Sequence, residues 1–350
     1  MDQFVLVRLV KCNALDLATF QFDFDLTFSV FFLHADGTIL GRYGSRLQRE
    51  ADHDISMDGL RRSIESALWL HKNFDTYKKP LAAKTGPPPR YPVPEKYPAL
   101  AGKYTAKLDY ENNVAHSCIH CHQIRDSELR LFRDGGKPIP DEVLYPWPAP
   151  GVVGLELDVD QRVTVKSVTK VSAAASAGFR AGDEILMLQG QPLVSPADIQ
   201  WVLHNAGDAA TLHARILRDG KASTLKLVLG PGWRRRSELA WRPTTWNLRR
   251  MGTGGLVLEH LPEADREKLD LPADTLALRV KHVGQYGDHA AAKRAGFKKD
   301  DVVVELDGRS EPMRETDLLA YAVQRKKRGE QVPVTVLRAG KRVLLKLPMQ

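Results

Sequence analysis

Residues 177–186 read AGFRAGDEIL, and residues 295–304 read AGFKKDDVVV, so one pattern returns 118 positions later (295 − 177). Each copy starts with Ala-Gly-Phe and runs into apolar residues of the kind that fill buried β-strands. An internal repeat of this length indicates that residues 150–350 fold as two similar units.

The two copies also continue alike, with a Gly turn, an apolar run at helical spacing and a closing hairpin turn. In the first copy these lie at Gln189-Gly190, 197–203 and Arg218–Lys221, and in the second at Asp307-Gly308, 317–323 and Arg338–Lys341. Because each copy has its own closing hairpin, we expect two small domains rather than stacked solenoid units.

This arrangement resembles the PDZ domain, in the form seen in bacterial extracytoplasmic proteases and scaffolds. The first copy, about residues 151–230, matches the whole pattern. The second, about residues 254–350, departs from it at Lys299, where the pattern has glycine. The resemblance implies a groove between one strand and one helix that accepts an extended peptide as an added strand. A loop before that strand would offer N–H groups to a terminal carboxylate.

The resemblance also assigns peptide-binding residues. The first groove would use Val153, Gly154, Leu155 and Leu157, with the helix around Gln200, Trp201, Leu203 and His204 as its far wall; the second would use Gly255, Leu256 and Val257. The alternative is that either copy only packs against its neighbour.

Two of the chain's three cysteines fall in Ser117-Cys118-Ile119-His120-Cys121-His122-Gln123, and C-x-x-C-H is the attachment signature of c-type haem. Two thiols at this spacing can each form a thioether with one porphyrin vinyl group, and the following histidine can bind the iron. The sequence therefore predicts haem c on Cys118, Cys121 and His122. The candidates for the sixth ligand are His116, His120 and His71, and an open or methionine-bound position fits equally.

Two other interpretations of this motif stay open. A C-x-x-C pair can be a redox dithiol, although the βαβ setting of thioredoxin is not evident around it. The cluster of His116, Cys118, His120, Cys121 and His122 could instead hold zinc, since thiolate and imidazole both suit that ion. The third cysteine, Cys12, has no cysteine nearby in the sequence, and we expect a buried small apolar residue.

Residues 1–77 show a β-rich pattern followed by a helix. Apolar runs at 4–10 and 28–33 predict strands, His34–Thr38 predicts a hairpin turn, and 39–44 predicts the returning strand. Ser56 can cap a helix whose apolar face runs to His71. This order resembles the C-terminal half of a thioredoxin fold, without the proline that this family places before the hairpin strand.

Three further segments complete the domain plan. Proline at high density makes 78–101 an extended linker, and 102–149 carries the C-x-x-C-H motif. Residues 232–253 combine three tryptophans with arginines. Such a segment could stack on bases or cage a ligand, but we favour an ordered strap with buried indoles and stacked guanidinium groups.

We therefore predict an α+β multidomain chain. Its parts are a partial thioredoxin-like α/β segment (1–77), a Pro-rich linker (78–101), a haem c-like segment (102–149), a PDZ-like β-barrel or sandwich (150–231), a Trp/Arg-rich strap (232–253) and a second PDZ-like domain (254–350).

The net charge is +8 and the pI about 9.3, but the basic residues are spread along the chain. This distribution favours a solvated basic surface over nucleic-acid binding. No apolar run is long enough to span a membrane. The first residues lack the features of a signal peptide. Haem attachment generally occurs outside the cytoplasm, so we expect an extracytoplasmic protein whose N-terminal part is missing from this sequence.

The order of these parts resembles a small bacterial family of thioredoxin-like/PDZ proteins, some of them selenoproteins. The leading hypothesis is a periplasmic adaptor whose PDZ domains bind protein or peptide C-termini and whose haem exchanges electrons with a redox partner. No Gly-x-Ser-x-Gly elbow is present, so we do not expect a serine hydrolase. The alternatives are a thiol–disulfide oxidoreductase using Cys118 and Cys121, and a PDZ scaffold with a zinc or structural Cys/His site.

Overall fold

A computed structural model of the chain describes residues 3–44 and 54–350. It divides into two compact units, which we describe separately. The first contains residues up to 127 together with 145–237, and the second contains 128–144 with 238–350. No helix in the described ranges has the length and apolarity that a membrane crossing requires.

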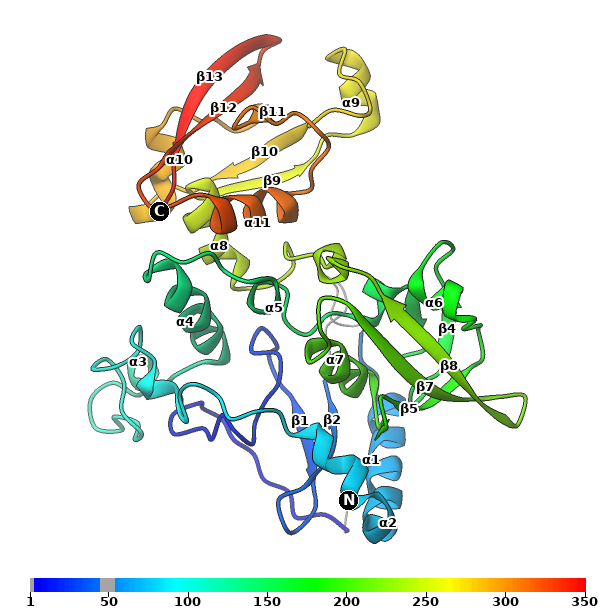
Figure 1. Ribbon diagram of the computed structural model, residues 1–350. Helices are drawn as coiled ribbons and strands as arrows, with labels where there is room; N and C mark the ends of the chain where they lie inside the picture. Colours follow the sequence, from blue (N-terminus) through cyan, green and yellow to red (C-terminus); the bar gives the residue numbers. More distant parts are fainter. Residues whose placement is uncertain (1–2, 45–53) are drawn as a thin grey trace. The chain divides into compact units, whose positions relative to one another are not determined.

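The N-terminal part of the first unit is built on one hairpin and two helices (Figure 1). Strands β1 (Val30–Leu33) and β2 (Ile39–Tyr43) pair antiparallel, and Gly37 takes φ +89° in the predicted turn. Helix α1 (Met57–Lys72) is capped by the Ser56 hydroxyl, as predicted, and α2 (Phe74–Leu81) follows it. The hairpin and both helices share one apolar core that includes Phe32, Leu40 and Leu70.

Two predictions for this part are wrong. The apolar run at 4–10 forms no strand, and Val5 and Val10 are 93% and 72% exposed, because β1 and β2 make a two-stranded sheet that does not include it. The resemblance to thioredoxin is accordingly not confirmed. The expected extended linker also begins as helix, since α2 runs to Leu81 with Pro80 inside it.

Short helices connect this part to the repeat. They are the 3₁₀ turns η2 (Ala82–Lys84) and η3 (Pro94–Lys96), helix α3 (Val114–Ser117), the longer helix α4 (Cys121–Arg133) and α5 (Asp141–Leu144). Helix α4 begins five residues before the predicted start at Asp126, so the second half of the C-x-x-C-H motif lies in its first turn (126 − 121).

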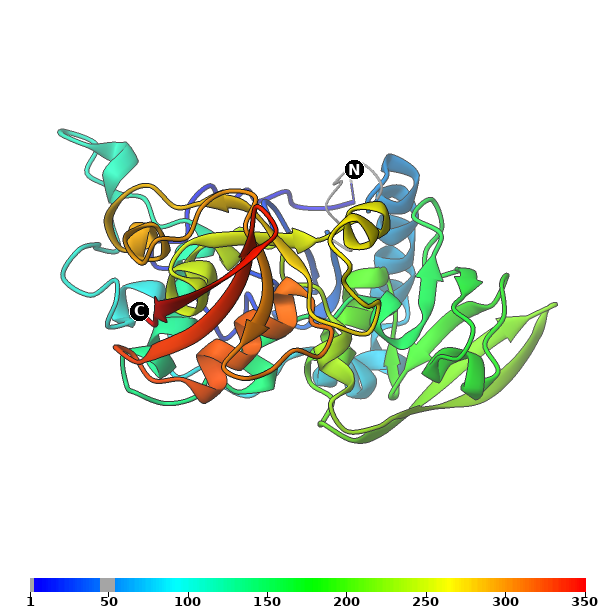
Figure 2. The same ribbon diagram turned by 90° about the horizontal axis from the view of Figure 1, so that it is seen from above.

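The first copy of the repeat has two sheets and two helices. Its elements are η4 (Pro150–Val153), β3 (Leu155–Leu157), β4 (Val165–Val168), α6 (Ala173–Ala177), β5 (Glu184–Leu188), β6 (Gln191–Pro192), α7 (Pro196–His204), β7 (Ala210–Arg218) and β8 (Lys221–Leu229). Strands β3 and β4 pair with each other, and the second sheet has the order β6-β5-β7-β8. The β7–β8 hairpin extends as a long ribbon (Figures 1 and 2).

The second copy forms a single sheet with the order β13-β12-β11-β10-β9. Turn η5 (Trp233–Arg236) ends the first unit, and the second continues with α8 (Thr245–Thr253), β9 (Leu256–His260), α9 (Glu263–Lys268), β10 (Leu278–Val283), η6 (Gly287–Ala290), α10 (Ala291–Arg294), β11 (Val302–Leu306), α11 (Glu315–Arg325), β12 (Gln331–Arg338) and β13 (Lys341–Pro348). The predicted helices and closing hairpins are confirmed in both copies. Neither copy closes into a barrel within the described residues, so that part of the predicted fold class is wrong.

The repeated motif has a structural reason in each copy. The Asp183 carboxylate accepts two hydrogen bonds from Arg218, at 2.6 and 2.7 Å, and Asp301 accepts two at 2.7 Å from Arg338. The turn before each aspartate needs a positive φ, which is +88° at Gly182 and +68° at Asp300. The second copy therefore departs from the pattern at Asp300 rather than at Lys299. Aspartate tolerates this backbone conformation better than most residues.

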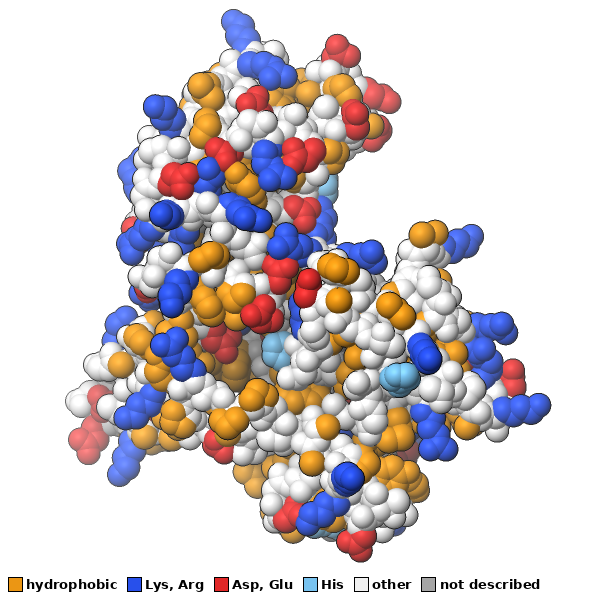
Figure 3. All heavy atoms as spheres, in the orientation of Figure 1, with side chains coloured by type: hydrophobic (Ala, Val, Ile, Leu, Met, Phe, Trp, Pro, Cys, Tyr) orange, Lys and Arg blue, Asp and Glu red, His pale blue; other side chains and the backbone are white. Residues whose placement is uncertain are grey.

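Basic side chains do not gather into one patch on the face shown in Figure 3, where Lys and Arg alternate with Asp and Glu. In the predicted Trp/Arg segment, Trp233 is buried and Arg234 lies over its ring at 4.7 Å, and Arg242 lies over Trp241 at 4.5 Å. Trp246 is 41% exposed and stacks on His289. The stacked guanidinium groups agree with an ordered strap.

Candidate peptide-binding grooves and cysteine cluster

Strand β3 of the first copy pairs with β4 along one edge, and its other backbone edge points away from β4. The Gly154 carbonyl accepts from Thr169 and the Asp158 N–H donates to Thr164, so these groups point toward the β4 side. Successive residues of an antiparallel strand direct their backbone groups to opposite edges. The Leu155 carbonyl and the Leu157 N–H therefore point outward, and no side chain of the described residues hydrogen-bonds to either group.

The loop before β3 is shaped by one glycine. Gly154 has φ +92°, and a Cβ at this position would lie 2.2 Å from Ser172 Oγ and 2.3 Å from Ser172 Cβ. Only glycine fits such a close approach without moving the start of α6. By contrast, a Cβ at Gly151 in the same loop would meet open space.

The side chains of the predicted groove residues point into the protein. Val153, Leu155 and Leu157 are 1%, 3% and 4% exposed, so β3 can offer a ligand its backbone rather than these side chains. The far wall on α7 is covered as well: Trp147 stacks on His204 with ring centroids 5.0 Å apart, and the Gln200 amide donates to the Trp147 carbonyl at 3.3 Å. The expected open wall is therefore closed by residues of the same unit.

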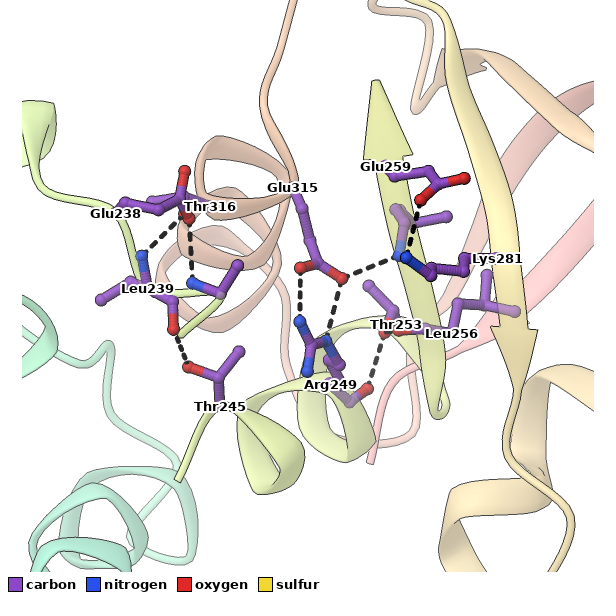
Figure 4. A network of polar contacts seen from close by, with 12 residues as sticks. Glu238, Leu239, Thr245, Arg249, Thr253, Leu256, Glu259, Lys281, Glu315 and Thr316 are labelled. Atoms are coloured by element: carbon purple, nitrogen blue, oxygen red, sulfur yellow. Dashed lines mark hydrogen bonds and ion pairs between the residues drawn. The ribbon is translucent and has the colours of Figure 1, made fainter. Parts of the chain in front are cut away.

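The corresponding edge in the second copy is hydrogen-bonded internally (Figure 4). The Leu258 N–H donates to the Glu315 carboxylate at 2.8 Å, and the Thr253 hydroxyl lies 3.0 Å from the Leu256 carbonyl. Leu256 and Leu258 correspond to Leu155 and Leu157. Helices α8 and α11 thus satisfy the two groups that β3 leaves outward.

Glu315 is held in place by a buried ion pair. Arg249 of α8 donates two hydrogen bonds to it, at 2.9 and 2.6 Å, and the two side chains are only 9% and 5% exposed. The network continues through Thr316, whose hydroxyl lies against Glu238 and accepts from the Leu239 N–H at 3.0 Å. These bonds link α8 to β9 and to α11.

A cleft of about 320 Å³ lies beside the loop of the first copy. Its lining includes Val152 and Val153 of the loop, the α6 residues Ala173 and Ser176, and Trp233 and Arg236. The cleft therefore combines hydroxyl and apolar groups with one cation. A carboxylate is the ligand that a guanidinium group binds best in such a setting.

The three cysteines lie together, which the sequence did not predict. Cys12 Sγ lies 3.5 Å from Cys121 Sγ, although the two residues are 109 positions apart. Cys12 is 7% exposed, whereas Cys118 and Cys121 are half-buried. The hydrogen bond from the Cys12 thiol lowers the pKa of Cys121; it raises the pKa of Cys12, and burial raises that pKa further. The prediction that Cys12 is buried is confirmed, and the cysteine that it contacts lies far from it in the sequence.

The histidines of the motif are divided between surface and interior. His122 Nδ1 lies 3.0 Å from the Phe24 carbonyl, which leaves Nε2 as the nitrogen able to bind a metal. His116 and His120 are exposed, and the ring of His71 on α1 lies against that of His34, which follows β1. Among residues 3–44 and 54–350, no three or more His, Cys, Asp or Glu side chains are arranged to hold a metal ion, so zinc has no ligand set there.

The fit of this site to c-type haem is partial. The Nδ1 contact of His122 leaves Nε2 for an axial bond, but the Cys121 sulfur is engaged by Cys12. Thioether formation at Cys121 would require this sulfur to leave its contact. The contact of the Cys12 sulfur with the Cys121 sulfur suits a disulfide better than a thioether at Cys121.

Comparison with known proteins agrees with the fold of the repeat. Residues 151–229 and 278–349 each match the PDZ domain family. The chain contains two PDZ domains. The match to the second PDZ domain begins at β10, after the edge strand β9.

Several proteins similar to this chain are bacterial proteases. The chain is 25% identical over 169 residues to a probable periplasmic serine endoprotease, DegP-like, of Pseudomonas fluorescens, covering 48% of this chain and 33% of that protein. It is 35% identical over 75 residues to the magnetosome formation protease MamE of Magnetospirillum gryphiswaldense, covering 21% of this chain and 10% of that protein. The chain thus spans about a third and a tenth of the length of these relatives.

A solved structure, the HtrA-type protease AlgW with decapeptide, aligns with a TM-score of 0.25 and 17% identity over 41% of this chain and 49% of that one.

The two PDZ domains differ where the sequence predicted equivalent sites. In the first PDZ domain the structure brings Val153, Gly154, Leu155 and Leu157 together as loop and edge strand. In the second, Gly255 and Leu256 are packed as tightly as Gly154 and Leu155, but the Leu256 carbonyl and the Leu258 N–H are bonded to Thr253 and Glu315. The sequence analysis missed Glu315 and Thr253. Glu315 lies two residues before the helix predicted at 317–323 and is the first residue of α11 in the structure.

Proposed function

We propose that this chain is an extracytoplasmic binding protein whose first PDZ domain captures the C-terminal end of a polypeptide. The observation that carries the proposal is the outward edge of β3, where the Leu155 carbonyl and Leu157 N–H can pair with an added strand. The same positions of the second PDZ domain are already bonded to Thr253 and Glu315. Peptide capture is therefore assigned to the first domain.

The location outside the cytoplasm is supported by the periplasmic DegP-like relatives. The cleft beside the loop supports recognition of a free C-terminus, since Arg236 lies in its lining. The covered α7 wall implies that a ligand bonds mainly to β3 and the loop, or displaces Trp147 from α7.

Hydrogen exchange of the full chain tests this assignment. The probes are a pool of random decapeptides with free C-terminal carboxylates and the same pool with amidated C-termini. We expect the free-carboxylate pool to slow exchange across Val153–Leu157 and to leave Leu256–His260 unchanged. Protection only at Leu256–His260, or no protection by either pool, would overturn the assignment.

A matched pair of variants locates the site. Gly154→Ala introduces a Cβ against Ser172 and should abolish binding, whereas Gly151→Ala meets open space and should bind like the wild type. Circular dichroism checks that both variants fold. Equal binding by the two variants would exclude the loop as part of the site.

The C-x-x-C-H motif carries a second candidate function, attachment of c-type haem. It is favoured by the residue pattern of the motif and by the contact of His122 Nδ1 with the Phe24 carbonyl. Bound haem would supply one-electron transfer, and His122 would hold it. An absorption spectrum of protein produced with haem-maturation machinery, before and after dithionite, tests it; a colourless product would remove this candidate. A thiol–disulfide function of the same cysteines is the remaining alternative.

A further inference from the structure

The contact between Cys12 and Cys121 has no role in peptide binding. Their sulfurs lie 3.5 Å apart, and an S–S bond is about 2 Å long, so a small side-chain movement would join them. We propose that Cys12 and Cys121 are the two halves of a disulfide, formed by exchange with a small disulfide oxidant. This inference does not depend on the proposed peptide function.

The backbone around the two sulfurs is already held in place by bonds that do not involve sulfur. The Cys12 N–H donates to the Ile119 carbonyl at 3.0 Å. The Asn13 side chain accepts from the Ile119 N–H at 2.8 Å and donates to the Ser117 carbonyl at 2.9 Å. Asn13 is 6% exposed, and Ile119 is fully buried. The segment at 12–13 and the loop before α4 are therefore docked before any covalent bond forms.

The position of Cys121 is fixed from its other side too. It is the first residue of α4, and the Gln123 side chain accepts from the His120 N–H at 2.8 Å and donates to the Tyr104 hydroxyl at 2.6 Å. The sulfur of Cys118 instead lies 3.8 Å from the carbonyl of its neighbour Ile119. The geometry thus favours Cys12 over Cys118 as the partner of Cys121.

The exposure of the cysteines sets the order of the exchange. Cys121 is half-buried and Cys12 is almost fully buried, so an oxidant R–S–S–R reaches Cys121 first. The Cys121 sulfur, having lost its proton, attacks R–S–S–R, forms a mixed disulfide and releases one RS⁻. The Cys12 sulfur then loses its proton, attacks the Cys121 sulfur and releases the second RS⁻. Two thiols are oxidised, and one disulfide is reduced to two RSH molecules.

The experiment uses the full chain with oxidised glutathione as the oxidant. The wild type, Cys118→Ser, Cys12→Ser and Cys121→Ser are each oxidised, alkylated at the remaining thiols, digested without reduction and analysed by mass spectrometry. We expect the wild type and Cys118→Ser to yield a linked pair of peptides that contain Cys12 and Cys121. Cys121→Ser should yield no such pair, and Cys12→Ser should keep a glutathione adduct at Cys121 or link it to Cys118.

Three results would overturn the proposal. The wild type could link only Cys118 and Cys121, Cys118→Ser could stop at a glutathione adduct with Cys12 alkylated, or the isolated protein could carry haem on Cys121. A comparison of native and urea-unfolded samples separates the folded geometry from random pairing, because unfolded chains should lose the preference for Cys12. If the hydrogen-exchange experiment showed no peptide binding, the disulfide links found by mass spectrometry would still be expected, so the two proposals fail independently.

Discussion

The Leu258 N–H donates to the carboxylate of Glu315 at 2.8 Å, a hydrogen bond that has no counterpart within the described part of the first PDZ domain. It uses the donor that an added strand would need on β9. The equivalent Leu157 N–H on β3 receives no side-chain partner from the described residues. The two domains therefore differ at this edge: Glu315, the first residue of α11, bonds to the β9 N–H, whereas the β3 N–H points away from β4.

Replacing Glu315 tests how much this bond and its ion pair stabilise the second domain. Glu315→Ala leaves Arg249 buried without its partner, which we expect to cost about 3–5 kcal/mol of the free energy of unfolding. Glu311→Ala removes an ion pair with Arg309 in which both side chains are nearly half exposed, and should cost less than about 1 kcal/mol. Urea unfolding of the two variants measures both losses of unfolding free energy, and hydrogen exchange on β9 and β10 shows whether the loss lies in this domain. Equal costs would contradict the structural role of Glu315.

Arg236 provides a test of terminal carboxylate recognition. If its guanidinium group binds the carboxylate in the cleft, Arg236→Gln should weaken the binding of free-carboxylate peptides about tenfold, since charge-assisted hydrogen bonds contribute about 1.5–3 kcal/mol. Amidated peptides should bind both proteins alike. Arg235→Gln is the control, because its neighbouring exposed side chain is not in the lining of the cleft. Fluorescence anisotropy with labelled peptides gives the comparison, and equal losses in the two variants would show a nonspecific charge effect.

The repeat was predictable because its signals are local. Positive φ at Gly220 and Gly340, the periodic helices and the paired hairpins all follow from short stretches of sequence. The prediction for residues 4–10 failed because an apolar run alone does not tell whether a neighbouring strand is available to pair with it. The contact of Cys12 with Cys121 spans 109 positions and leaves no periodicity or motif to detect. The candidate sites depended on such long-range contacts, and so they were predicted only in part.

Asp183 should make the first PDZ domain sensitive to acid. Burial alone would raise its pKa, but the hydrogen bonds from Arg218 and from the Arg180 N–H outweigh burial and lower the pKa below its ordinary value of 3.8. A group whose pKa is lowered on folding stabilises the protein above its unfolded pKa, and this stability is lost as the pH falls through the folded value. We therefore expect urea midpoints of the wild type to fall below about pH 4 more steeply than those of Asp183→Asn, which has no carboxylate to protonate. Parallel curves for the two proteins would rule out this linkage.

Lys84 leads us to expect a pH dependence of the same sign in the alkaline range, because the pKa of this residue is also lowered in the folded protein. Lys84 is fully buried and forms an ion pair with Asp198 at 2.7 Å. Burial lowers its pKa from 10.5 to about 8, because the attraction of Asp198 only partly offsets the loss of solvation and Arg42 adds repulsion. Below pH 8 both folded and unfolded chains hold this proton. Between about pH 8 and 10.5 only the unfolded chain holds it, so the free energy of unfolding contributed by Lys84 rises with pH, by at most about 3 kcal/mol.

The matched variants for this test are Lys84→Met and Lys79→Met. Lys84→Met has no proton to lose, and Asp198 keeps its hydrogen bond from the Val194 N–H at 2.8 Å. The wild type should therefore gain stability over Lys84→Met between pH 8 and pH 10, the range below the pKa of Arg42, which burial lowers to about 10. Lys79 is exposed on α2, so Lys79→Met should follow the wild type at every pH. Urea unfolding at pH 7, 8.5 and 10 supplies the comparison. A stability difference between wild type and Lys84→Met that does not change with pH would mean that Lys84 stays charged in the folded protein throughout this range, held there by Asp198.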